Sequence, residues 1–372
     1  MLPNPSMKRI LPLLALCALA LPASADFYWL AVGIPNNANA NANGGAGNYL
    51  ILSNDDPSVT DFKPVKLFDV RRTENGGTKL YKNNNQNGTE PYEGCPYGGA
   101  HYDLTLPIKD ADGTEFTFVG FASEAFKQNS YIGSIKLPDT LEYINYATFW
   151  QARYLTDFQW PADMTNFTKL EHRIFDTCSR LVGPIEIPSK FVNCGDRMFC
   201  DCTSLIGVGG ISVTNVGENA FQNCPKLEAL EFGDGESVTF KKESLRGSWN
   251  ESASVPKALF FRSAPPVLND QWLGNTGNSV VDFVANRGVV VYIPLNETKD
   301  GPTDSWVQFQ TAVAATTSTT ATPNALVFPA SNGDGTWTDG SLKISGSSAK
   351  NKTVTVRFWD PNSTATSSLL AY

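Results

Sequence analysis

Six cysteines after residue 25 are the side chains best suited to carry chemistry, since they can form disulfides, bind zinc or remain buried thiols. No C-x-x-C pair and no suitably placed histidine supports a zinc site, so no metal is expected. If a disulfide forms, we expect it between Cys194 and Cys200. The other interpretation is a ladder of buried, unoxidised thiols at Cys178, Cys202 and Cys224, which share one spacing.

Catalytic sequence patterns are absent. The two histidines, His101 and His172, lie in no H-E-x-x-H sequence, and there is no G-x-S-x-G elbow or glycine-rich phosphate loop. We therefore expect a protein that is not an enzyme and needs no cofactor. Because two carboxylates that are distant in sequence can converge in space, a hydrolase with a carboxylate site remains an alternative.

Aromatic and arginine side chains offer binding chemistry instead. Tyr131, Tyr154 and Arg180 follow one another at intervals of 23 and 26 residues, and Trp150 lies close to them in sequence. Such residues are typical of binding hot spots, unless the N-terminal region covers them. A second candidate patch, for which a plain solvated face is the alternative, is formed by Lys136, Gln159, Glu186 and Glu231.

These intervals come from a repeat. A Phe is followed three positions later by a small or polar residue and six positions later by an aliphatic residue, and the Phe-to-Phe steps are 23, 26, 24 and 22 residues. Steps of this length predict a solenoid whose stacked coils share one apolar core, with positions one and five after the Phe facing solvent. The predicted core comprises Phe126, Phe149, Phe175, Phe199 and Phe221 with Ile132, Leu155, Leu181, Leu205 and Leu227.

Each coil is also expected to contribute one strand. Apolar residues nine and eleven positions after the Phe alternate with polar ones, which is the period of a half-buried strand. Pro138, Pro161 and Pro188 follow these segments and end them, because proline has no N–H to donate. One extra residue in the third coil, Gly183 or Pro184, predicts a bulge.

The segment 135–144, IKLPDTLEYI, followed by Ala147-Thr148-Phe149, resembles one unit of the BspA-like leucine-rich repeats. Residues 197–205 and 216–227 resemble the same unit, and residues 259–267 and 289–294 resemble the closing segment found after such repeats. The resemblance covers roughly residues 114–309. It implies a β-rich leucine-rich-repeat solenoid of about five irregular coils, in a secreted or surface-displayed bacterial protein that binds other macromolecules. A fold resemblance does not identify the partner.

Residues 1–25 have the features of a cleavable signal peptide. Lys8 and Arg9 precede a short apolar run, and Ala23-Ser24-Ala25 forms an A-x-A cleavage site, so we expect export and a mature chain that starts at Asp26. No later segment has 18 consecutive apolar residues, so no membrane span is expected in the mature chain. The formal net charge of −8 becomes −10 when the two signal-peptide cations are removed, which argues against a nucleic-acid partner.

The sequence divides into four regions after the signal peptide. We expect an N-terminal β region and cap with Asn-rich loops at 26–113, and a hairpin of 102–108 and 115–119 that covers the first coil. The repeats and their closing segment occupy 114–309, and a Thr/Ala-rich linker occupies 310–324. Residues 325–372 form β segments that belong either to an incomplete module or to the solenoid itself.

These features together favour an exported, adhesin-like protein that binds an extracellular protein or a surface polymer through its repeats. The alternatives are a carbohydrate-binding surface module, a structural envelope or matrix protein, and a hydrolase with a carboxylate site in a terminal region.

Overall fold

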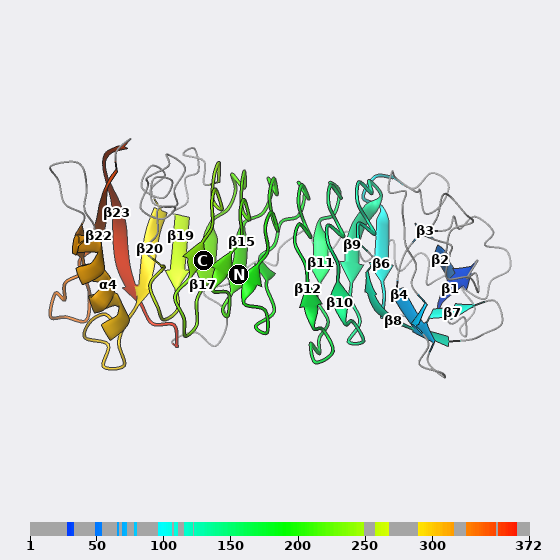
Figure 1. Cartoon of the computed structure of the whole chain (residues 1–372), viewed down its shortest axis with the longest axis horizontal. Coiled ribbons are helices and arrows are strands. Elements are labelled where there is room, and N and C mark those ends of the chain that lie inside the picture. Colours follow the sequence, from blue (N-terminus) through cyan, green and yellow to red (C-terminus); the bar gives the residue numbers. More distant parts are fainter. Residues whose placement is uncertain are drawn as a thin grey trace, which may run out of the picture.

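The structure is a computed structural model that describes residues 28–32, 49–53, 65–66, 69–72, 78–79, 96–105, 108–110, 115–121, 123–248, 257–267, 289–315, 325–346 and 349–362. They form an elongated solenoid, with short strands lying side by side along the long axis (Figure 1). The predicted signal peptide lies outside the described residues and stays a prediction.

Two ladders of parallel strands run along the solenoid, where the sequence predicts one. The first contains β6 (Ala100–Asp103), β9 (Ile132–Lys136) and β11 (Asp157–Gln159), then β13 (Ile185–Glu186), β15 (Gly207–Gly210), β17 (Ala229–Phe232), β19 (Lys257–Phe261) and β20 (Val289–Pro294). The second contains β8 (Glu115–Phe121), β10 (Tyr143–Ile144) and β12 (Lys169–Leu170), then β14 (Asn193–Cys194), β16 (Asn215–Val216) and β18 (Thr239–Phe240). Most strands of the second ladder have two residues, too few to show a period of two.

Both ladders are interrupted between the same two coils. Strands β11 and β13 belong to different sheets, and so do β12 and β14. The extra residue at Gly183 or Pro184 lies just before β13, but β13 pairs with β15 in regular register. The predicted bulge is therefore wrong, because the pairing of β13 with β15 shows no shift of register.

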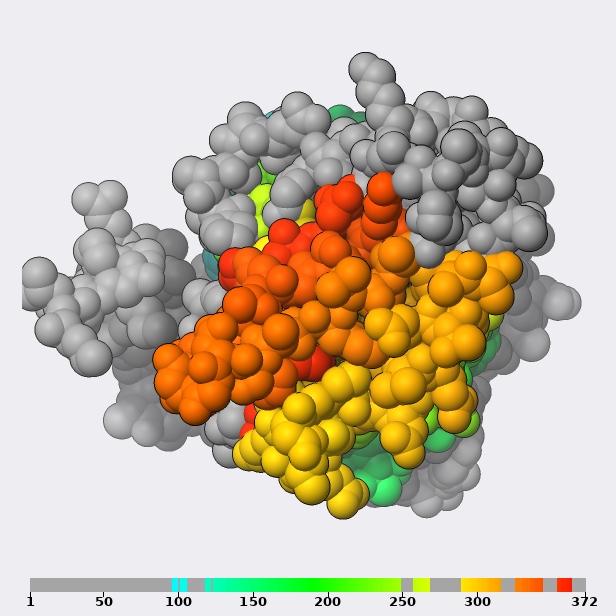
Figure 2. Space-filling model, turned by 90° about the vertical axis from the view of Figure 1, so that its left-hand side faces the viewer, coloured from blue at the N-terminus to red at the C-terminus, as the bar shows by residue number. Residues whose placement is uncertain are grey.

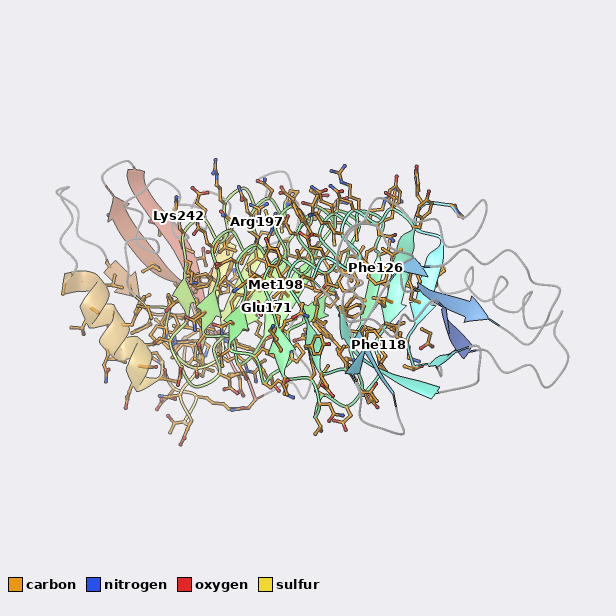
Figure 3. All side chains as sticks on the ribbon, turned by 45° about the vertical axis from the view of Figure 1, so that its right-hand side comes forward. Phe118, Phe126, Glu171, Arg197, Met198 and Lys242 are labelled. Atoms are coloured by element: carbon orange, nitrogen blue, oxygen red, sulfur yellow. The ribbon has the colours of Figure 1, made fainter. Side chains whose placement is uncertain are left out.

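The turns around the phenylalanines remain continuous across this break. Five rings stack along the axis, with centroids 5.4, 5.8, 5.4 and 5.5 Å apart and planes within 13° of parallel. Backbone bonds accompany them: the Phe149 N–H donates to the Ile174 carbonyl at 3.0 Å, and the Phe175 N–H donates to the Met198 carbonyl at 2.9 Å. All ten predicted core residues are buried. Phe118, Phe126 and Met198 lie among the side chains that fill the interior (Figure 3).

Each turn is made sharp by two residues in left-handed conformation, two positions before and two positions after the Phe. In coil three these are Arg173, with a φ of 58°, and Thr177, with a φ of 64°. The same geometry recurs around Leu245, where Glu243 has a φ of 56° and Gly247 a φ of 72°. This is a sixth turn that the sequence pattern missed, because Leu replaces the Phe at its centre.

The N-terminal strands extend the edge of the second ladder. Strand β7 (Ile108–Asp110) pairs antiparallel with β8, as the predicted hairpin requires. Strand β6, however, leaves this hairpin and pairs in parallel with β9, so the predicted segment 102–108 is divided between the two ladders. The remaining strands are β1 (Tyr28–Val32), β2 (Tyr49–Ser53), β3 (Val65–Lys66), β4 (Asp69–Arg72) and β5 (Thr78–Lys79).

The C-terminal strands continue the first ladder and close its end. Strand β23 (Ala349–Trp359) pairs in parallel with β20, then antiparallel with β22 (Gly340–Gly346), which pairs with β21 (Ala325–Val327). Of the two interpretations of residues 325–372, packing onto the solenoid is the one the described strands adopt, and no separate module forms among them.

Helix α4 (Asp304–Ala315) lies across this end with the strands that follow it (Figure 2). It buries Trp306, Phe309 and Val313. The predicted linker at 310–324 is therefore wrong for residues 310–315, because these residues complete the helix that covers the last apolar surface of the core.

We expect Phe175→Ala to lower the free energy of unfolding by about 3–5 kcal/mol, because the cavity would lie between two stacked rings. Denaturant unfolding followed by circular dichroism would measure it. The control is Val182→Ala, an exposed residue of the same coil, for which a change within about 0.5 kcal/mol is expected. Equal effects of the two substitutions would contradict the role of the ring stack.

Candidate functional site

The candidate site is the surface of the first three turns, residues 123–131, 146–154 and 173–180, which we call the turn face. Three tyrosines gather there. The ring centroid of Tyr97 lies 5.3 Å from that of Tyr131 and 5.2 Å from that of Tyr154. The Arg180 guanidinium carbon lies 4.2 Å from the centroid of Tyr154. The structure thus brings together three of the predicted residues, Tyr131, Tyr154 and Arg180, which we call with Tyr97 the tyrosine cluster.

Tyr97 is the member of the tyrosine cluster that sequence reasoning missed. Tyr97 precedes the first copy of the repeat, so the repeat pattern could not predict its place on this face. Its side chain is 61% exposed, the most exposed large apolar residue of the described chain. The neighbouring Gly98 has a φ of +75°, and a Cβ there would lie 3.2 Å from the Tyr154 Cβ. A glycine therefore allows this segment to approach coil two.

Trp150 lies on the same face, but its ring is not an open platform. The Lys127 Nζ lies 4.4 Å from the indole centroid, and the Arg173 guanidinium carbon lies 4.1 Å from it. These cations come from the two coils that flank coil two, so the indole is held between them. Cation–π contacts of this kind contribute about 0.5–2 kcal/mol each. Trp150 therefore holds two cations in place on the turn face.

The repeat predicts that position one, the residue after the Phe, faces solvent in every coil. Coil three departs from this prediction. Asp176 occupies it in coil three and is 0% exposed. Its Oδ2 accepts hydrogen bonds from Arg173 Nε at 2.9 Å and from Arg197 Nε at 2.8 Å. The hydrogen bond with Asp176 raises the pKa of Arg197. Burying an unpaired carboxylate costs free energy, and two guanidinium partners offset that cost. Asp176 can therefore be buried because two arginines neutralise it.

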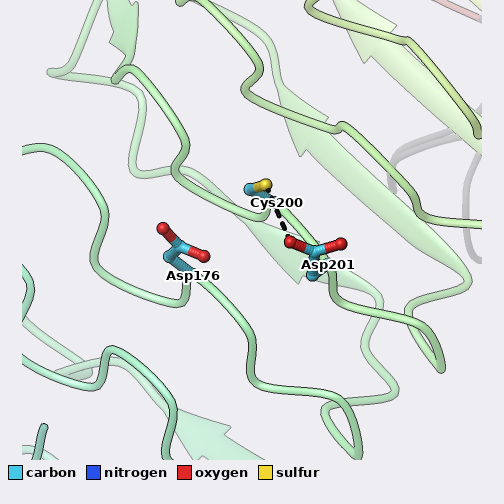
Figure 4. Close-up of side chains that lie close together, drawn as sticks. All are labelled: Asp176, Cys200 and Asp201. Carbon is cyan, nitrogen blue, oxygen red and sulfur yellow. Dashed lines mark hydrogen bonds between the residues drawn. The ribbon is translucent and has the colours of Figure 1, made fainter.

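Asp176, Cys200 and Asp201 place possible metal ligands within 4.8 Å of one another (Figure 4). The donor set does not favour a metal, because two guanidinium groups already bind the Asp176 carboxylate. Burial raises the pKa of the Cys200 thiol, so the thiol stays protonated. Its S–H donates a hydrogen bond to Asp201 Oδ2, with a distance of 3.3 Å between sulfur and oxygen. We interpret the group as a hydrogen-bonded ionic cluster that fastens coil three to coil four.

The five cysteines of the described chain are free and buried. The conditional pair Cys194–Cys200 is therefore not formed. The thiols of Cys178, Cys202 and Cys224 donate to the Phe149, Phe175 and Phe199 carbonyls at 3.1, 3.0 and 3.1 Å. Each thiol thus binds a backbone oxygen of the preceding coil, next to the stacked rings. Position three is therefore a small buried slot of the fold, which holds Ala152 in coil two and hydrogen-bonded thiols in coils three to five.

The second predicted patch, on the strand face, is only partly exposed. Lys136 and Gln159 are exposed and Glu186 is half-buried, whereas Glu231 is 0% exposed and accepts a hydrogen bond from Arg262. The prediction that Glu231 belongs to a binding surface is therefore wrong. The closing segment supplies the arginine that neutralises it, and the repeat pattern contains no information about that contact.

We expect Asp176→Asn to destabilise the fold by about 1.5–3 kcal/mol, because two guanidinium groups would lose their counter-charge. Denaturant unfolding would measure the loss. The control is Asp234→Asn, whose carboxylate is exposed and lies outside this cluster, and for which a change within about 0.5 kcal/mol is expected. An Asp176→Asn variant as stable as the control would show that the network does not join the coils.

The buried thiols also predict a dependence on alkaline pH. Burial raises the pKa of Cys224 from 9.0 to about 12. The stabilising effect is complete below about pH 9 and is lost as the pH rises toward 12, because the unfolded thiol ionises first. In Cys224→Ala, the fall of unfolding free energy with pH should be shallower by up to about 1.4 kcal/mol per unit. Equal slopes for wild type and variant, measured by unfolding between pH 8 and 11, would contradict it.

Comparison with known proteins addresses the repeat directly. Residues 120–248 match the model of the BspA type leucine rich repeat region, in six copies. The chain matches no curated protein in sequence.

Similar solved structures include the T. pallidum leucine rich repeat protein, with 22% identity over 44% of this chain and 73% of that chain and a TM-score of 0.31. A leucine-rich repeat protein from Bacteroides ovatus has 14% identity over 64% and 66%, with a TM-score of 0.33. A leucine rich cell surface protein from Faecalibacterium prausnitzii has 12% identity over 66% and 85%, with a TM-score of 0.27. The six matched copies agree in number with the six turns described above, and residues 120–248 of this chain form a BspA type leucine rich repeat region.

Proposed function

We propose that this chain is an exported, adhesin-like binding protein that captures a macromolecular partner through the turn face, without catalysis. The tyrosine cluster is the observation that carries the proposal. Tyrosine and arginine side chains provide large contact areas with few rotatable bonds, and they dominate binding hot spots. The exposed ring of Tyr97 marks the point where a partner would make contact first.

The turn face is also organised before any partner arrives. Tyr97 is held by contacts with two other rings, and Arg180 is held over Tyr154. The turns beneath them are joined by backbone hydrogen bonds, such as the one from the Gln151 N–H to the Asp176 carbonyl at 2.7 Å. Side chains that are ordered in the free protein lose less conformational entropy on binding, which favours affinity.

A position outside the cell is part of the proposal. The signal-peptide features of residues 1–25 support it. No helix among the described residues is long and apolar enough to cross a bilayer. The five free thiols of the described residues are compatible with export, because each is buried away from oxidants in the solvent.

The test is capture by the immobilised mature chain, from Asp26 onward, of extracellular matrix proteins and glycans. We expect the double variant Tyr154→Ala/Arg180→Ala to bind its partner about tenfold or more weakly, because the cluster would lose its anchor and its cation. The control is Lys226→Ala, which removes an exposed cation from the same repeat position in coil five. Thermal unfolding would verify that both variants remain folded.

Capture that is equal in wild type and double variant would remove the turn face as the binding site. Absence of any capture, together with self-association of the wild-type chain in light scattering, would favour the structural envelope or matrix role instead.

A further inference from the structure

We propose that the turn face binds a linear anionic polysaccharide, which lies along the solenoid axis and contacts successive coils. This inference rests on the proposed function for the location of the site and adds the chemical class of the ligand. Three features support it: the local charge, the arginines that form no ion pair among the described residues, and the periodic arrangement of aromatic side chains.

The turn face is positively charged on an acidic chain. Its three turns contain four cations and only two carboxylates, a net charge of +2, whereas the whole chain carries −8. Both carboxylates are already neutralised. Glu124 pairs with Lys127 at 2.8 Å, and Asp176 is buried between Arg173 and Arg197. An anionic ligand would therefore meet no free negative charge there.

Two arginines of this face are exposed and make no ion pair within the described part of the chain. They are Arg153 in coil two and Arg180 in coil three. The Tyr154 ring supports the guanidinium of Arg180 from one side, which holds the group without using its N–H donors. A guanidinium presents its donors in a planar fork that matches the oxygens of a carboxylate or a sulfate. The two side chains are therefore suited to acidic substituents of a polymer.

The aromatic rings distinguish a sugar polymer from other polyanions. The π face of a tyrosine is electron-rich and attracts the slightly positive C–H bonds on the flat side of a pyranose ring. Tyr97 offers such a face at the surface. Tyr131, Tyr154 and Arg180 stand at position five of three successive coils, whose stacked phenylalanine rings are 5.4 and 5.8 Å apart. A linear polymer along the axis would thus meet one of these side chains in every coil.

The experiment measures binding of the mature chain to polygalacturonate and to chondroitin sulfate, with dextran as the uncharged polymer. Binding to the two anionic polymers should weaken steeply with added salt, because exposed charge pairs are screened. The variant Arg153→Gln/Arg180→Gln should bind about tenfold more weakly, with a shallower salt dependence. Tyr97→Ala should weaken binding without changing the salt dependence.

The matched control is Lys226→Gln/Lys242→Gln, which removes the same charge from exposed side chains of coils five and six and should bind as wild type does. Equal losses in the two double variants would overturn the proposal, since binding would then depend on net charge alone. Equal affinity for dextran, for polyglutamate or for single-stranded DNA would also overturn it.

The two proposals fail separately. If neither anionic polysaccharide binds, but the chain captures a protein that the Tyr154→Ala/Arg180→Ala variant does not, the ligand class is wrong and the proposed function stands. If polysaccharide binding persists in that variant and in Arg153→Gln/Arg180→Gln, the turn face itself is not the site.

Discussion

The stacked phenylalanine rings, with the backbone hydrogen bonds that join their turns, are the interaction on which the rest of the structure depends. They set the distance between coils and keep it between 5.4 and 5.8 Å, even where both strand ladders stop. The longest step in the stack, 5.8 Å between Phe149 and Phe175, lies at that break. Because the rings and the turn hydrogen bonds continue there, one core runs through both halves of the solenoid.

The same stack determines what the turns present to solvent. A tight turn with two left-handed residues leaves little room, so a polar side chain that points inward is enclosed by the neighbouring turns. Polar groups that point inward need partners: the thiols of Cys178 and Cys202 use the carbonyls of neighbouring coils, and Asp176 uses two arginines. Those arginines then stand at the surface in fixed positions, and Arg173 covers Trp150. The ion pairs that stabilise the buried Asp176 therefore also determine where positive charge lies on the surface of the turns.

Repetition explains which parts of the site could be predicted. Tyr131, Tyr154 and Arg180 share a position with residues of neighbouring coils, so their alignment followed from counting. Tyr97 and Arg262 lie outside the repeat, and the contacts they make, with Tyr154 and with Glu231, join segments that are unrelated in sequence pattern. Position one was also misjudged, since the repeat marks a place in the turn but not whether a buried charge finds partners there.

The sequence by itself determined the solenoid, the identity of its core and the register of its turns, because the burial of one apolar side in every coil leaves a periodic signal. Only the tertiary structure decided how the ends are closed, which cysteines stay apart, which acids are buried and which aromatic rings meet. These outcomes depend on contacts between residues that no period relates, such as α4 with β21 through Gln310 and Leu326. Their energies arise from local packing and charge pairing, which exist only once the coils are stacked.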